Sequence, residues 1–230
     1  MNNKAWISLF IFTLFVHLAS DFLPVSYLAL ITKPLLMVIL LNWFNTATGN
    51  ISSGHKRWVT LALCFSWLGD VLLMFQDKDS MFFLLGLSAF LIAHLFYIVF
   101  FYRVKVAEQL SSKWLVIFIA PYYALLIGTL YPYLGEMKLP VLVYGVVICC
   151  MFYLALHMLF LENRFVGRLM AIGALLFVVS DSVLALNKFY QPFESAGIIV
   201  MLTYGLSQLL ITAGAIQYIN ESSPATSQAS

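Results

Sequence analysis

Eight stretches of about 20 mostly apolar residues, joined by short polar connections, constrain this chain more than any other feature of its sequence. A helix of this length crosses the roughly 30 Å hydrocarbon layer of a bilayer. A helix also satisfies its own backbone hydrogen bonds, as a chain in lipid must. The sequence therefore predicts an all-α fold, a polytopic membrane helix bundle with eight transmembrane helices. The predicted spans are residues 5–20, 27–44, 58–76, 81–102, 114–133, 140–161, 166–186 and 194–219.

Composition agrees with this fold class and excludes others. Of the 230 residues, 63% are hydrophobic and 10% are charged, against about 25% charged in soluble domains. A water-soluble fold is thereby excluded. The net charge of +2 is spread between the apolar runs, which leaves no basic surface for nucleic acid. Cys64, Cys149 and Cys150 all lie in apolar runs and match no metal-ligand spacing, so we expect no metal or other cofactor.

The connections are too short to form a domain outside the membrane. We expect residues 1–219 to form one transmembrane domain and the polar residues 220–230 to form a disordered cytoplasmic tail. The span 5–20 is long, is followed by Asp21 and Pro24, and lacks a small-x-small cleavage site. These features favour a retained helix over a signal peptide.

Basic residues in the connections predict the orientation of the bundle. Cytoplasmic loops of membrane proteins carry an excess of Lys and Arg. The side that holds both termini carries eight of them and the opposite side three, so both termini are predicted to be cytoplasmic. The short loops and few cysteines favour a bacterial inner membrane. The eight are Lys4, Lys56, Arg57, Arg103, Lys105, Lys113, Arg164 and Arg168, and the three are Lys78, Lys138 and Lys188.

A faint internal repeat links the two halves of the chain. Asp70 and Asp181 lie 111 residues apart in similar local sequences, and at the same offset Tyr97 falls on Gln208. The third and fourth spans therefore match the seventh and eighth. Two parallel four-helix repeats are one interpretation, and chance similarity between apolar helices is the other.

Three charged residues lie inside the predicted spans, where lipid should reject them. Each of Lys33, Asp70 and Asp181 would cost roughly 2.5 to 3.5 kcal/mol at mid-helix if left unpaired. All three must therefore face the interior of the bundle. At 1.5 Å per residue, each lies roughly 8 to 9 Å below the outer boundary, so they share one layer.

Four more polar side chains extend this layer towards the midplane. They are His94 and Tyr97 on span 81–102, and Tyr204 and Gln208 on span 194–219. Tyr204 and Gln208 are four residues apart and share a helix face. His94 has no second ligand four residues away, which is more typical of a hydrogen-bonded interior histidine than of a metal ligand. The pattern predicts a polar pocket that opens outward and narrows inward.

Charge balance indicates what such a pocket could do. One lysine cannot neutralise two ionised carboxylates. If Asp70 and Asp181 lie close together in a low dielectric, one carboxyl is expected to keep its proton while the other stays ionised. An acid and a base would then stand side by side, as general acid–base catalysis requires.

Other functions also fit these residues. A buried Lys–Asp pair can simply fix helix packing in a non-catalytic scaffold. Intramembrane Lys and Asp also serve as relays in small proton-coupled transporters. The sequence holds no Gly-x-Ser-x-Gly, His-Glu-x-x-His or phosphate-binding loop, so serine hydrolase, zinc protease and nucleotide-driven chemistry have no support.

Five short motifs follow one another from the second span to the eighth. They are Lys-Pro-Leu at 33–35, Gly-Asp-Val-Leu-Leu-Met at 69–74, the segments 86–90 and 93–97, the segment 173–177 leading into 180–182, and Thr203-Tyr204 with Gln208. In this order they resemble the motifs of the YhhN family of lysoplasmalogenases. The resemblance covers nearly all of the membrane region.

The resemblance implies a membrane ether hydrolase that cleaves the vinyl ether bond of lysoplasmalogen into a fatty aldehyde and glycerophosphoethanolamine or glycerophosphocholine. Its expected partners are the lysophospholipid substrate and membrane lipid. Vinyl ether hydrolysis protonates the β-carbon, passes through an oxocarbenium ion and adds water, which two unequal carboxyls can serve. We expect Asp70 and Asp181 to be catalytic, in either order, with Lys33 biasing their protonation or binding the phosphate. The residues expected to position the ether oxygen and the water are His94, Tyr97, Tyr204 and Gln208.

Overall fold

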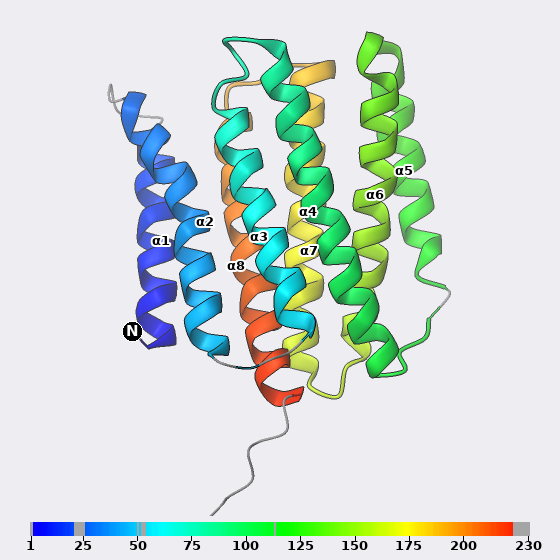
Figure 1. The fold of residues 1–230 in the computed structure, drawn as a ribbon. Helices are drawn as coiled ribbons and strands as arrows, with labels where there is room; N and C mark the ends of the chain where they lie inside the picture. Colours follow the sequence, from blue (N-terminus) through cyan, green and yellow to red (C-terminus); the bar gives the residue numbers. More distant parts are fainter. Residues whose placement is uncertain (1, 21–25, 50, 52–53, 113, 223–230) are drawn as a thin grey trace, which may run out of the picture.

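The chain forms an up-and-down bundle of eight long helices (Figure 1). The computed structural model describes residues 2–20, 26–49, 51, 54–112 and 114–222, and among these residues no strand occurs. The helices are α1 (Asn3–Ser20), α2 (Ser26–Thr48), α3 (Gly54–Leu73), α4 (Ser80–Ala107), α5 (Val116–Leu130), α6 (Lys138–His157), α7 (Arg164–Ala185) and α8 (Ala196–Ser222).

Each predicted span corresponds to one of these helices, and the differences lie at the ends. Helix α4 continues to Ala107 and α8 to Ser222, because a helix does not have to stop where the hydrocarbon layer stops. The side chain of Asp79 caps α4 by accepting a 2.8 Å hydrogen bond from the backbone N–H of Met81. Of the predicted disordered tail, residues 220–222 belong to α8, and residues 223–230 lie outside the described residues.

Six of the helical segments are long and apolar enough to cross a membrane, namely those that contain α1, α2, α4, α6, α7 and α8. The chain is therefore an integral membrane protein. The other two helices depart from this pattern for different reasons. Helix α5 has only 15 residues, and α3 begins with the polar sequence Gly-His-Lys-Arg, which lowers its apolar character.

The centre of the bundle is built from two closely packed helix pairs, α3 with α4 and α7 with α8. Glycines allow the close approach. A β-carbon added to Gly86 would lie 2.7 Å from the Leu73 side chain, and one added to Gly173 would lie 3.0 Å from the carbonyl oxygen of Ser207. Helix α2 packs on α3 and α8, and α6 packs on α4 and α7. Helices α1 and α5 lie at the two outer edges (Figure 1).

The predicted cytoplasmic basic residues gather at one end of the bundle. Helix α1 starts, α4 ends and α8 ends at this end, which is the lower one in Figure 1. Lys4, Lys56, Arg103 and Arg164 all lie in the helical turns there. Lys113 lies outside the described residues. The opposite end, with Lys78, Lys138 and Lys188, holds the α3–α4 and α7–α8 connections, so the charge asymmetry on which the orientation was predicted follows the shape of the fold.

The glycine at the α7–α8 contact provides a test of this packing. Replacing Gly173 with Val is expected to lower the free energy of unfolding by roughly 1 to 3 kcal/mol, because the added carbons meet the Ile211 and Ser207 backbone. The matched control is Gly128→Val on α5, where no described atom lies within 4 Å of an added β-carbon. Thermal unfolding of both purified variants in detergent would measure the difference. Equal stability of the two would contradict the packing described here.

Candidate active site

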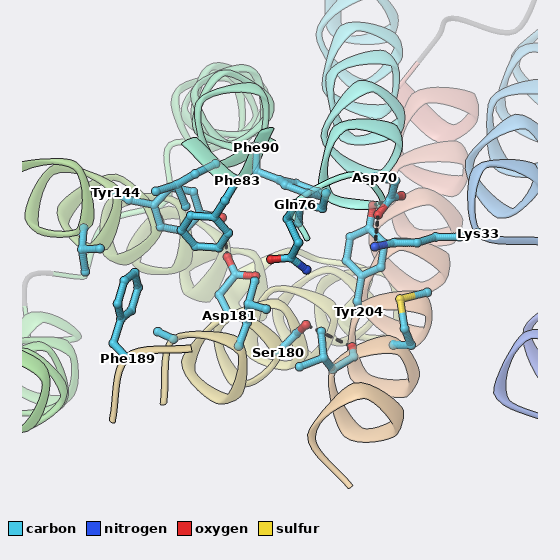
Figure 2. A pocket seen from close by; sticks show the side chains of 17 residues that line it. Lys33, Asp70, Gln76, Phe83, Phe90, Tyr144, Ser180, Asp181, Phe189 and Tyr204 are labelled. Carbon is cyan, nitrogen blue, oxygen red and sulfur yellow. Dashed lines mark hydrogen bonds and ion pairs between the residues drawn. The ribbon is translucent and has the colours of Figure 1, made fainter. Parts of the chain in front are cut away.

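A cavity of about 800 Å³ lies between α2, α3, α4, α6, α7 and α8, within the usual size range of small-molecule sites. It is near the end of the bundle where α3 connects to α4 (Figure 2). Most of its lining is apolar, with Phe83, Phe90 and Phe189 prominent. The polar lining residues are Lys33, Asp70, Gln76, Tyr144, Ser180, Asp181 and Tyr204.

Asp70 lies on one side of this cavity between a cation and a hydroxyl. Lys33 Nζ is 3.9 Å from Asp70 Oδ1, and the Tyr204 hydroxyl donates a 2.8 Å hydrogen bond to Asp70 Oδ2. The Asp70 side chain is only 2% exposed, whereas that of Lys33 is 19% exposed. Both carboxyl oxygens therefore have a partner, and the nearby positive charge offsets the loss of water around an ionised group.

Asp181 lies on the other side of the cavity, with Gln76 between the two acids in Figure 2. The Tyr144 hydroxyl donates a 2.5 Å hydrogen bond to Asp181 Oδ2, and His94 Nε2 lies 3.9 Å from the same oxygen. Among the described residues, no Lys or Arg forms an ion pair with Asp181. Hydrogen bonds from these residues reach Oδ2 and leave Oδ1 without a donor. The two acids thus have unlike surroundings.

His94 is held behind Asp181 rather than in the cavity. Its Nδ1–H donates a 2.6 Å hydrogen bond to the carbonyl oxygen of Phe90, one turn earlier in α4. The ring packs edge-on against Phe177 at 4.6 Å and Tyr144 at 5.4 Å between centroids. These contacts fix the imidazole so that Nε2 faces Asp181, the one ionisable group near that atom among the described residues.

Tyr97 and Gln208 form a buried polar layer below the cavity. The Tyr97 hydroxyl donates a 2.7 Å hydrogen bond to Gln208 Oε1, and Gln208 Nε2 donates a 2.9 Å hydrogen bond to Ser66 Oγ. All three residues are completely buried. Of the residues expected to contact substrate, Lys33 and Tyr204 line the cavity, whereas His94, Tyr97 and Gln208 do not. The expectation of direct contact is corrected for these three, because they bond to other protein groups.

Tyr144 is the residue at the site that the sequence reasoning missed. An isolated tyrosine in an apolar span looks like any tyrosine that faces lipid or a neighbouring helix. The repeat offset contained the signal, because Tyr144 follows Lys33 by the same 111 residues that separate Asp70 from Asp181. Lys33 pairs with the first aspartate and Tyr144 with the second. One equivalent position thus supplies a cation in one half of the chain and a hydroxyl in the other.

The fold and the cavity define a class of protein, a polytopic membrane protein in which two carboxyl groups share an apolar cavity. Among the described residues, no three His, Cys, Asp or Glu side chains gather as a metal site would need. Residues 28–215 match the family model of the YhhN family. The chain therefore belongs to the YhhN family.

Named relatives match most of the chain. It is 32% identical to the lysoplasmalogenase TMEM86B of Homo sapiens, over 92% of this chain and 87% of the relative. It is 31% identical to a lysoplasmalogenase of Mycobacterium bovis, over 70% of this chain and 60% of the relative. No solved structure matches the chain.

The buried layer below the cavity yields a second prediction. Tyr97→Phe removes the hydrogen bond to Gln208 Oε1 and leaves that oxygen buried without its donor. The free energy of unfolding is expected to fall by about 1 to 3 kcal/mol. Tyr102→Phe is the matched control, since Tyr102 is on the same helix and 55% exposed. Thermal unfolding of the two variants would test this, and an unchanged Tyr97→Phe protein would refute it.

Proposed function

We propose that this protein is a lysoplasmalogenase that hydrolyses the vinyl ether bond of lysoplasmenylethanolamine or lysoplasmenylcholine. The products are a fatty aldehyde and glycerophosphoethanolamine or glycerophosphocholine. The observation that carries the proposal is the unlike setting of the two acids in one cavity, with Asp70 beside a lysine and Asp181 beside a tyrosine. The relationship to proteins named lysoplasmalogenase supports the substrate class.

The first chemical step requires an acid. A proton is added to the β-carbon of the vinyl ether, which converts the double bond into an oxocarbenium ion. Asp181 is the better donor because no Lys or Arg among the described residues favours its ionised form. Tyr144 occupies Oδ2, so a proton on Oδ1 would be directed at the substrate. The resulting carboxylate is also close enough to stabilise the cation.

The second step requires a base and a place for the phosphate. Asp70 beside Lys33 is the carboxylate suited to take a proton from the attacking water. The Lys33 ammonium is partly exposed to the cavity and 3.9 Å from Asp70, which is longer than a tight hydrogen bond. It can therefore bind the substrate phosphate while it remains near Asp70. Tyr204 holds the other oxygen of Asp70 and fixes its direction.

The final step returns both acids to their starting states. Water addition gives a hemiacetal, which breaks its bond to the glycerol oxygen. The proton taken up by Asp70 passes to that oxygen, and the hemiacetal hydroxyl proton returns to Asp181. The sum is one vinyl ether and one water converted into one aldehyde and one alcohol. His94, Tyr97 and Gln208 act as positioning residues, since they contact the walls of the cavity rather than its interior.

The membrane arrangement belongs to the same proposal. All eight helices cross a bacterial inner membrane as one domain, with both termini in the cytoplasm and the cavity opening towards the outer face. The gathering of basic residues at the opposite end from the cavity supports this orientation. The hydrogen bond between Tyr97 and Gln208, two positions related by the 111-residue offset, supports two parallel four-helix repeats.

Substitution of the acids tests the proposed chemistry. Asp70→Asn and Asp181→Asn are each expected to lower kcat by roughly 10²- to 10⁴-fold, because an amide can neither donate nor accept the required proton. The control is Asp77→Asn, which changes an exposed aspartate in the α3–α4 connection. Aldehyde release from lysoplasmenylethanolamine by purified protein in detergent micelles is the measurement.

The outcomes of that assay separate the proposed enzyme from its rivals. Full turnover by either Asn variant would exclude that aspartate from the chemistry. Wild-type protein that releases no aldehyde, but carries out flux in liposomes driven by a pH gradient, would favour a proton-coupled transporter. A protein with neither property would fit a scaffold.

An isotope experiment in D₂O tests which acid has which role. If Asp70 is the base for water, Asp70→Asn slows water addition, and the oxocarbenium ion has time to lose a β-proton and revert. Recovered substrate should then carry deuterium at the β-carbon, as measured by mass spectrometry. Asp181→Asn is expected to leave the recovered substrate unlabelled. Deuterium in the Asp181→Asn reaction alone would reverse the two roles.

A further inference from the structure

A second hollow opens beside the catalytic cavity, between α4 and α6. It has a volume of about 550 Å³. From α4 it is lined by residues spaced three and four apart, which share one helix face. At 1.5 Å per residue, residues 84 to 91 extend about 10 Å along the helix. We call this hollow the α4–α6 groove, and its main lining residues are Leu84, Leu87, Leu91, Leu139, Val143 and Tyr144.

The α4–α6 groove adjoins the reaction site directly. Leu87 and Tyr144 line both the groove and the catalytic cavity. Tyr144 is the contact between them, because its ring forms part of the groove while its hydroxyl bonds to Asp181. A molecule that occupied both hollows would pass over the acid that we propose as the proton donor.

The surface of the α4–α6 groove is suited to hydrocarbon. Its two hydroxyl groups are already engaged, since Ser88 donates a 2.8 Å hydrogen bond to the carbonyl oxygen of Leu84 and Tyr144 donates to Asp181. Val143 is 45% exposed and Leu139 is 71% exposed at the outer side of the groove. In a bilayer, these exposed apolar side chains face lipid. The groove therefore offers a ligand apolar contact and no free polar partner.

We propose that the α4–α6 groove binds the hydrocarbon chain of the lysophospholipid and admits it sideways from the bilayer. The inference rests on the proposed function, because it uses the position of the vinyl ether between the head group and the chain. With the phosphate at Lys33 and the chain in the groove, the bond to be cleaved lies between the two acids. The chain never has to leave apolar surroundings during entry.

Filling the groove tests this proposal. Val143→Trp adds bulk to the groove wall. Val146→Trp is the matched control, because Val146 is on the same helix, is similarly exposed at 49% and does not line the groove. The substrates are lysoplasmenylethanolamine with a long alkenyl chain and an analogue with a four-carbon alkenyl chain. Both share the head group and the vinyl ether.

The expected result is a change in chain selectivity. Val143→Trp should reduce the ratio of kcat/KM for the long chain to kcat/KM for the short chain by at least about tenfold. Val146→Trp should leave the ratio at the wild-type value. An unchanged ratio in Val143→Trp would overturn the groove proposal, while wild-type cleavage of both substrates would leave the proposed function intact.

Photo-crosslinking gives a measurement that needs neither a stable variant nor catalysis. The probe is lysophosphatidylethanolamine with a diazirine at the end of its acyl chain, bound to wild-type protein in nanodiscs. Adducts are expected in residues 84–91 and 139–144, as located by mass spectrometry. Adducts spread evenly over lipid-facing residues of all helices would overturn the proposal, even if the protein cleaved no vinyl ether.

Discussion

The ion pair between Lys33 and Asp70 sets the main constraint on this bundle. Neither group is stable alone in hydrocarbon, so α2 and α3 have to present them to each other. Tyr204 then ties α8 to the same carboxyl group. Three helices are thus fixed around one buried charge, and the close α3–α4 and α7–α8 contacts extend this arrangement to the rest of the core.

The second acid gains its character from what it lacks in comparison with the first. Asp181 occupies the matching position in the other half of the chain, yet its neighbour is Tyr144 rather than a lysine. A single difference in the partner side chain is enough to give two chemically identical carboxyl groups different tendencies to hold a proton. This is the simplest physical basis for an acid and a base built on similar helices.

Much of this site could be predicted from the sequence because lipid makes charged residues conspicuous. Lys33, Asp70 and Asp181 are unusual in apolar spans, and their depths follow from counting residues along each helix. The rotation of each helix could not be obtained in this way. Spacing placed His94 and Tyr97 on one face, but only packing shows that this face lies behind the cavity wall. Tyr144 was missed because an aromatic residue in an apolar helix carries no such signal.

The layer beneath the cavity has an electrical consequence. Tyr97 and Gln208 bond to each other, and the fully buried Phe100 and Phe101 pack further along the same helix as Tyr97. Water that reaches the acids can therefore return only through the end by which it entered. Protons taken up and released during turnover would be exchanged with a single aqueous phase. An acid site at this depth then neither draws on the membrane potential nor short-circuits it.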